Sequence, residues 1–441
     1  MPTETIASDL RIDAAIAALD ARIARQLDEI LHHPTFQRLE RAWRGLWFVV
    51  ERTPFSENIR IELLNCTKAE LAADLANPGG PLKGAFYGLV YTAEIGRVGG
   101  EPFGAVITSF ELDGGPDDLA LLERSAAVSR EALAPFIVAV NPAFLGVATF
   151  EDLPEPGSIP ARLEGTDHAG YAAFRQTDEA RYVGLVLPRF LLRAPFGELA
   201  GAGGAETFAY VEDVTGQHED YCWGSAAYAF ATRLADSFAR YRWCPNIIGP
   251  NDGMVTELHI HRYRVDGEER TQLPTEIALS DSRELELSGE GFIPLVGRDG
   301  WNQACFFSAN SAQKPRYFGS SEEGQAAEAN YRLGTQLPYM FIMTRVMQYL
   351  KMMHRSHFEA WAARSDVEKE LNDWVGQFVA DRNPMPQGTR GRRMLRKARI
   401  LVRESADEEG WHRLCLHVRP HFKFMGAFFT LTIENRLELP R

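Results

Sequence analysis

The stretch that decides the fold runs from Gly104 to Val140 and reads GAVITSFELDGGPDDLALLERSAAVSREALAPFIVAV. Gly104–Ser109 and Phe136–Val140 are short apolar runs of strand length, and Asp117–Leu133 between them has the length and polarity of a helix. A strand, a helix and a second strand in this order are typical of an α/β domain. We therefore expect an α/β fold in which helices and strands are mixed.

Similar runs continue on both sides of this stretch. The expected strands lie at Ile59–Leu64, within Arg181–Arg193, across Met254–Phe307, and at Ala398–Arg403, His412–Val418 and Phe428–Ile433. The expected helices lie at Lys68–Leu75, Trp223–Tyr241, Gln325–Phe358 with an interruption at Pro338, and Asp366–Val379. Leu153–Pro160 is a candidate seam, and Gly197–Gly204 is expected to be a flexible loop.

The N-terminal region predicts a one-sided helix that Pro34 ends. Its apolar residues follow a 4-3-4-7 spacing, with Gln26 in the missing position, which is a heptad-like seam. These residues are Ile12, Ile16, Leu19, Ile23 and Ile30. Two interpretations remain open: the seam docks on another helix, or this is an ordinary amphipathic helix packed on its own domain.

A second helix is expected from Phe36 to Val50. Trp43 and Trp47 lie one turn apart in it. Two aromatic residues at this spacing are usually part of a core, and we expect that here.

Composition excludes several classes of protein. The 441 residues are 45% apolar and carry 47 basic and 60 acidic side chains, which gives a formal net charge of −13. This balance argues against a whole-chain nucleic-acid binder. The N-terminus lacks the pattern of a secretory leader, no window reaches ~18 consecutive apolar residues, and the five cysteines are odd in number and form no CxxC pair. We expect a cytoplasmic protein without membrane insertion.

The sequence contains no recognisable catalytic constellation. GxxxxGK[ST] and GxSxG are absent, and Gly201, Gly203 and Gly204 form only a glycine-rich loop. His259 and His261 would project to one face of a strand, but no third and fourth zinc ligand accompanies them. We therefore expect no catalytic, cofactor-binding or metal residues and no cofactor.

One window of charge stands out. From Arg382 to Arg403 there are eight Lys and Arg residues and no Asp or Glu; they include Arg390, Arg392, Arg393, Arg396 and Lys397. Because no aromatic residue is interleaved, a stacking platform for single-stranded nucleic acid is not indicated. An acidic protein partner and a solvated basic loop remain as interpretations, and we favour the partner.

His33–Leu46 reads HPTFQRLERAWRGL and resembles the entry motif of the large sheath subunit of bacterial type VI secretion systems, the TssC/VipB (ImpC) family. Further motifs follow in the family's order. They are GGEPFGA (99–105), APFI (134–137), DEARYVGLVLPRFLLR (178–193), FARYRWCPNIIGP (238–250), PTE (274–276), FFSANSAQKP (306–315), LGTQLPYM (333–340) and RPHFKFMGA (419–427). The resemblance extends from about Ile12 to the C-terminus.

This resemblance implies a structural role and no enzyme activity. Such subunits pair with a small subunit, TssB/VipA, and stack with copies of themselves into a contractile sheath around the Hcp inner tube, anchored to a baseplate. It also implies a two-domain sheath fold with N-terminal helices and C-terminal strands that pair with neighbouring subunits. We expect an N-terminal arm over residues 1–52, a core over 53–380 and these strands within 381–441.

The strand residues expected to meet neighbouring subunits are Ile400, Val402, Phe428, Thr430 and Thr432. Family members commonly carry a longer extension before the HPTFQRLE motif, which holds the segment recognised by the recycling ATPase ClpV; only 32 residues precede His33 here. Two alternatives follow for recycling: ClpV does not recycle this subunit, or recycling depends on another subunit. The alternatives are a single-component sheath of the phage-tail or pyocin kind and a metal-dependent hydrolase using His259 and His261.

Overall fold

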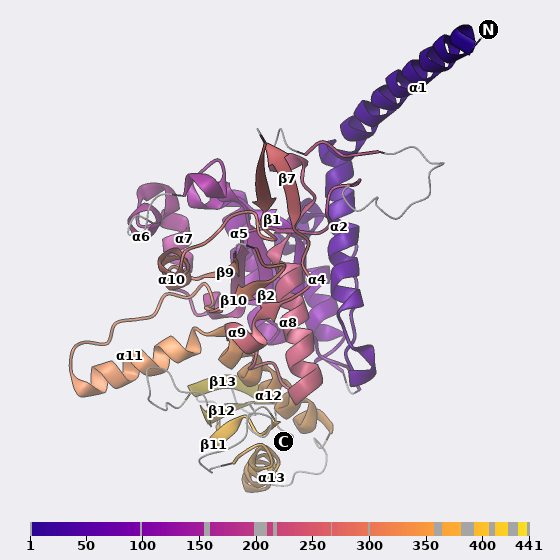
Figure 1. Cartoon of the computed structure of the whole chain (residues 1–441). Helices are drawn as coiled ribbons and strands as arrows, with labels where there is room; N and C mark the ends of the chain where they lie inside the picture. Colours follow the sequence, from indigo (N-terminus) through magenta and orange to yellow (C-terminus); the bar gives the residue numbers. More distant parts are fainter. Residues whose placement is uncertain are drawn as a thin grey trace.

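The structure, a computed structural model, is built around a six-stranded sheet with the order β1-β2-β3-β9-β10-β6 (Figure 1). It describes all residues except 1, 98, 154–158, 198–209, 215–217, 266, 299, 357–363, 381–391, 405–410, 422–430 and 439–441. The strands are β1 Val106–Leu112, β2 Phe136–Val140, β3 Val183–Leu187, β9 Phe292–Gly297, β10 Ala304–Phe306 and β6 Met254–Val255. The first four are parallel, and β10 pairs antiparallel with β9 and β6.

Strand β2 shows how the sheet separates two cores. Its odd and even residues point to opposite faces. Phe136 and Val138 join one apolar cluster, which contains Leu122 of α5 (Pro116–Ala132). Ile137 joins the other, which contains residues of α8 (Ala226–Tyr241) and α12 (Leu337–Ser356). Because both faces are covered, β2 and β3 are continuous buried apolar runs, as parallel strands require.

The two N-terminal helices differ in their setting. Helix α1 (Pro2–Leu31) projects away from the body, and α2 (Pro34–Glu51) runs along its side (Figure 1). The side chain of His33 caps α2 by accepting a hydrogen bond from the Thr35 amide, and Pro34 occupies the first turn, where a missing N–H costs nothing. Helix α1 therefore ends where the sequence predicted.

The C-terminal part forms a separate antiparallel sheet with the order β11-β12-β13. Its strands are β11 Leu395–Glu404, β12 Trp411–Pro420 and β13 Leu431–Glu438. Helix α13 (Arg364–Gly376) packs on β11, where the Asn372 side chain bonds both the amide and the carbonyl of Ile400. Helix α11 (Glu322–Gly334) precedes α12.

Shorter elements complete the described chain. The small antiparallel pairs are β4 (Phe190–Leu191) with β5 (Trp223–Gly224), and β7 (His261–Val265) with β8 (Glu268–Gln272). The short helices are α3 Lys68–Leu75, α4 Ala85–Tyr87, α6 Ile159–Leu163, α7 Ala169–Phe174, α9 Gly249–Asp252 and α10 Asp281–Gly289. Single turns lie at η1 Phe55–Glu57, η2 Pro81–Lys83, η3 Gly88–Thr92, η4 Pro142–Leu145, η5 Phe150–Asp152, η6 Thr166–His168, η7 Glu179–Tyr182 and η9 His218–Asp220.

Most predicted elements are confirmed. The strand–helix–strand unit of Gly104–Val140 is present as β1, α5 and β2, and the long helix is interrupted between Gly334 and Leu337, with Pro338 in the first turn of α12. Helix α10 was not predicted within the strand-rich region. The loop expected at Gly197–Gly204 lies outside the described residues from 198 onward.

The strand predicted at Ile59–Leu64 is wrong. These residues have strand-forming side chains, but β1, the edge strand of the sheet, pairs only with β2 among the described strands. A strand exists only where a second backbone accepts its hydrogen bonds.

Within the described residues, no helix has the length and apolar character needed to span a membrane. None of the five cysteines, all of which lie among the described residues, forms a disulfide, and Cys222, Cys305 and Cys415 are buried.

Candidate assembly surfaces

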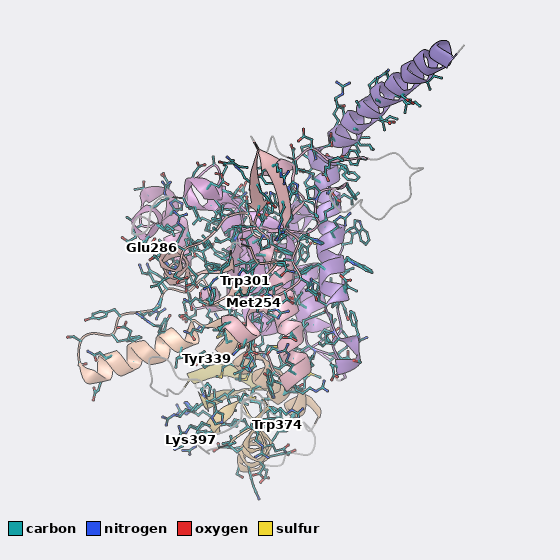
Figure 2. All side chains as sticks on the ribbon, viewed as in Figure 1. Met254, Glu286, Trp301, Tyr339, Trp374 and Lys397 are labelled. Carbon is teal, nitrogen blue, oxygen red and sulfur yellow. The ribbon has the colours of Figure 1, made fainter. Side chains whose placement is uncertain are left out.

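The predicted seam of α1 lies in solvent. Ile12, Ile16, Leu19, Ile23 and Ile30 are between 41% and 55% exposed. Figure 2 shows the side chains of α1 projecting away from the rest of the ribbon. The interpretation in which this helix packs its seam on its own domain is therefore wrong, because nothing described in the chain covers these residues.

The C-terminal end of α1 is held to the body by polar contacts. The Tyr210 hydroxyl donates to Asp28 Oδ1 at 2.5 Å, and His32 Nε2 lies 3.2 Å from Glu212 Oε1. His32 Nδ1 also lies 3.6 Å from a carboxylate oxygen of Asp220. Burial raises the pKa of Asp220. These contacts set the direction in which the exposed seam projects.

Helix α2 is fixed by a buried ion-pair cluster. Arg193 Nε donates to Glu40 Oε1 at 2.8 Å and its Nη2 donates to Glu212 Oε1 at 2.9 Å. Burial on its own raises the pKa of Glu212, but the hydrogen bond and charge of Arg193 outweigh it, and the pKa is lowered. Because removing one member of a buried pair leaves an uncompensated charge, this cluster anchors α2 and α1 to the segment after β4.

A second buried cluster surrounds Arg189. Its Nε and Nη2 donate to the Glu276 carboxylate at 3.0 and 2.5 Å, and Nη2 also donates to Glu219 Oε1 at 2.9 Å. His218 Nε2 lies 3.0 Å from Glu276 Oε1. Burial opposes ionisation of Glu276, but hydrogen bonds from His218 and Arg189 prevail and lower its pKa to about 2.

The ligand atoms of His218, Glu219 and Glu276 lie within 4.8 Å of one another, close enough to share a metal ion. Arg189 already donates to both carboxylates, so a metal ion would have to displace its guanidinium group. The positive charge that these carboxylates require is thus supplied by the chain itself.

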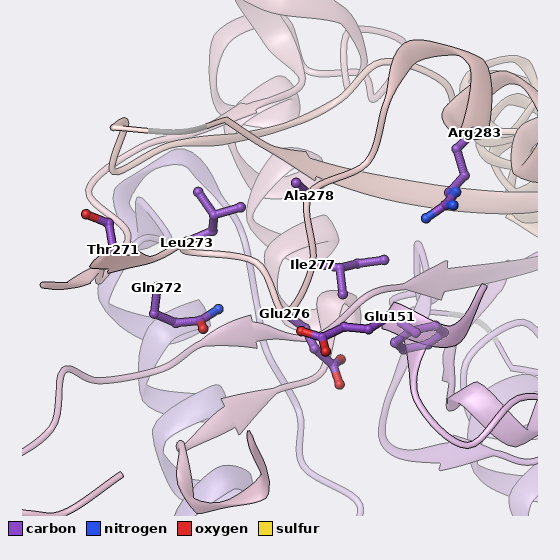
Figure 3. Close-up of a pocket in the computed structure, with 9 residues that line it drawn as sticks. Glu151, Thr271, Gln272, Leu273, Glu276, Ile277, Ala278 and Arg283 are labelled. Carbon is purple, nitrogen blue, oxygen red and sulfur yellow. The ribbon is translucent and has the colours of Figure 1, made fainter. Parts of the chain in front are cut away.

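A cavity of about 380 Å³ opens beside this cluster (Figure 3). Glu276 lines it together with Glu151 and Arg283, but the Arg283 guanidinium donates to the Leu153 carbonyl. Glu276 and Arg283 are therefore engaged in holding the fold, and Glu151 is the other carboxylate among the described residues that line the cavity.

His259 and His261 do not form the shared face that a metal-dependent hydrolase would need. His261 begins β7, is buried, and its Nδ1 lies 2.7 Å from the Tyr221 hydroxyl, whereas His259 is exposed and precedes the strand. Burial lowers the pKa of His261.

The residues predicted to meet neighbouring subunits occupy different positions in the C-terminal part of the chain. Ile400 and Val402 are buried within this chain, so a neighbouring subunit would not contact their side chains directly. The Val402 amide donates to Glu368 of α13, which covers that edge of β11 together with Asn372. Thr432 lies in β13 opposite His417 of β12. Phe428 and Thr430 lie outside the described residues.

The described part of the basic window, residues 392–403, lies at the start of this sheet. Arg392, Arg393 and Lys397 are exposed and Arg396 is half-buried, whereas Arg390 lies outside the described residues. Figure 2 shows Lys397 at the rim of the C-terminal sheet.

Sequence reasoning missed two features. Trp43 and Trp47 are each 64% exposed, so the expectation that they belong to a core is wrong. Arg189 and Arg193 were quoted only as part of a motif, although two arginines inside an otherwise apolar run signal buried partners.

Two family models match the chain. VipB, described as EvpB/VC_A0108, tail sheath N-terminal domain, matches residues 13–313. VipB_2, described as EvpB/VC_A0108, tail sheath gpW/gp25-like domain, matches residues 326–437. The type VI secretion system sheath protein TssC1 of Pseudomonas aeruginosa is 34% identical over 432 residues, which cover 97% of this chain and 86% of that protein. The chain therefore belongs to the VipB/TssC family of large sheath subunits of the type VI secretion system.

Proposed function

We propose that this subunit assembles with a small sheath subunit, TssB/VipA, and with copies of itself into a cytoplasmic contractile tube around Hcp that stands on a baseplate. The observation that carries the proposal is the unburied seam of α1, from Ile12 to Ile30. Apolar side chains regularly spaced on one side of a projecting helix lose free energy when a partner helix covers them.

The C-terminal strands supply the second contact. A strand donated by a neighbouring subunit adds to the outer edge of β13, because α13 covers part of the other edge of the sheet. Main-chain hydrogen bonds hold neighbours together without dictating side-chain packing. Subunits linked in this way stay connected while they rotate during contraction.

The free energy of contraction comes from two packings of the same subunits. A sheath built from heterologous contacts forms an open helix, and all its subunits change packing together. In this scheme residues 1–52 form the arm, 53–380 the body and 381–441 the linking strands. The exposed basic residues Arg392, Arg393 and Lys397 face an acidic surface of a neighbour.

Co-expression with the adjacent small-subunit gene tests this function. Negative-stain microscopy should show long hollow cylinders only when both chains are present. Cylinders from this chain alone would instead identify a single-component sheath, and the absence of any complex with the small subunit would contradict the proposal.

A further inference from the structure

Helix α2 has two apolar sides. Its inner side packs on the body through Gln37, Gly45 and Val49, which are buried. Its outer side carries Leu39, Trp43 and Trp47, which are 57%, 64% and 64% exposed. At 100° per residue these three lie within about 80° of one another and on the side opposite the buried residues. The inner side is covered by the body, and a row of large apolar residues left exposed on the outer side is typical of a surface that another chain covers.

The segment that follows α2 has a backbone without a pairing strand in the described part of the chain, although Ile61 packs against the core and Arg60 pairs with Glu101. Residues 59–65 read IRIELLN, and Leu63 and Leu64 are exposed. Among the described residues, the backbone of 59–63 makes no hydrogen bond to another part of the chain. The side chains of this segment favour a strand, and its backbone has no pairing strand among the described elements. A strand edge from another chain would supply the missing hydrogen bonds.

A second copy of this chain does not fit these features. In a polar helical sheath, copies meet through different patches, so a second copy would need a complementary apolar face elsewhere. The one other row of large exposed apolar residues in the described chain is the seam of α1, which the proposed function assigns to the small subunit. Large exposed apolar residues elsewhere, such as Leu285 on α10, Trp301 before β10 and Tyr317 before α11, lie on separate elements.

Charge and continuity point to another chain. Helix α1 carries six acidic and three basic residues, so its net charge is −3, and two such helices repel each other. Only His32 and His33 separate α1 from α2, so a partner seated along α1 reaches the first turn of α2. Such a partner presents an apolar helix flanked by basic residues.

We propose that Leu39, Trp43 and Trp47 of α2, together with residues 59–65, dock the small sheath subunit, which supplies a helix face and a strand edge. This inference rests on the proposed function. Trp43 and Trp47 contribute most of the binding free energy of this contact, because large aromatic side chains at the centre of an interface usually do so.

The test is a pull-down with the tagged small subunit co-expressed with this chain. Trp43→Glu and Trp47→Glu should each reduce the co-purified chain by about tenfold or more. Trp301→Glu is the matched control, because Trp301 is 59% exposed and lies elsewhere, and it should co-purify at the wild-type ratio. All three isolated chains should unfold at the wild-type temperature, since the replaced side chains are exposed.

A second pair of variants tests the strand contact. Alternate amides of a strand point to opposite sides, and proline has no amide hydrogen. One of Glu62→Pro and Leu63→Pro should therefore reduce capture strongly, whereas the other should change it little.

The outcomes separate this inference from the proposed function. Capture of wild-type chain with loss in the tryptophan variants supports the α2 site. Equal capture of wild type and both tryptophan variants overturns it while the proposed function stands. Intact heterodimers that no longer form cylinders would show that α2 contacts a second copy, which also overturns it. Failure of the wild-type chain to bind the small subunit overturns both.

Discussion

Gly45 of α2 lies directly against the ring of Tyr228 of α8, and a Cβ atom at position 45 would overlap that ring. Tyr228 is buried, so the ring has no free space into which to move. This contact is what lets α2 approach α8 closely, and it fixes which side of α2 faces the body.

Gly45→Ala should therefore lower the stability of the isolated chain. Overpacking of this kind costs ~1–3 kcal/mol. Thermal unfolding followed by circular dichroism measures the effect. Gly289→Ala is the control, because nothing lies within 4 Å of a Cβ at that position. Equal melting temperatures for the two variants would contradict the close packing of α2 on α8.

The Arg193 cluster predicts a large effect from a single charge. Arg193→Ala leaves Glu40 and Glu212 buried without their cation, which costs ~3–5 kcal/mol. Arg240→Ala breaks an exposed pair with Asp236 and should cost ~0–1 kcal/mol. Urea unfolding of both variants compares the two costs, and similar midpoints would show that the cluster does not anchor α2.

Glu276 predicts a dependence of stability on pH. Burial opposes its ionisation, but hydrogen bonds from His218 and Arg189 lower its pKa to about 2 in the folded chain, from the usual glutamate value of 4.5. The folded pKa is the lower one, so its contribution is present above about pH 4.5 and is lost as the pH falls toward 2. A lowering of this size corresponds to roughly 3 kcal/mol.

Glu276→Gln removes this contribution. The difference in unfolding free energy between wild type and variant should be greatest near pH 7 and shrink between about pH 5 and pH 2. Chemical unfolding at several pH values measures it. A difference that stays constant over this range would mean that the Glu276 carboxylate is not selectively stabilised by Arg189 and His218.

A charge placed on the exposed seam of α1 should prevent assembly without lowering the stability of the isolated chain. Leu19→Asp places a charge on the exposed seam, whereas Ala14→Asp places one on the other side of the same helix. Both chains should melt as wild type, and only Leu19→Asp should fail to bind the small subunit in size-exclusion chromatography. Binding by both variants would exclude the seam as a contact.

The outer edge of β13 predicts a selective effect on cylinders. Adjacent amides of an antiparallel strand alternate in direction, so one of Thr432→Pro and Ile433→Pro removes an outward donor and the other a donor to β12. The variant that keeps the wild-type melting temperature should form heterodimers but no cylinders by electron microscopy. Normal cylinders from that variant would show that β13 receives no neighbouring strand.

The central unit of the fold was predictable because its signals are local. Apolar runs of strand length and a helix of 17 residues between two of them lie next to one another in the sequence. The Ile59–Leu64 prediction failed for the opposite reason. The β-propensity of a segment depends on its own side chains, whereas the strand that pairs with it lies elsewhere in the sequence.

By itself, the sequence determined the order of helices and strands, the apolar seam of α1 and the family motifs, since periodicity and spacing are properties of the chain alone. Only the tertiary structure decided what covers each apolar side. It left Trp43 and Trp47 in solvent, and it brought Arg193 to Glu40 across 153 positions. Burial and ion pairing depend on distances between elements far apart in the sequence, and helical periodicity specifies a side of a helix without specifying its neighbour.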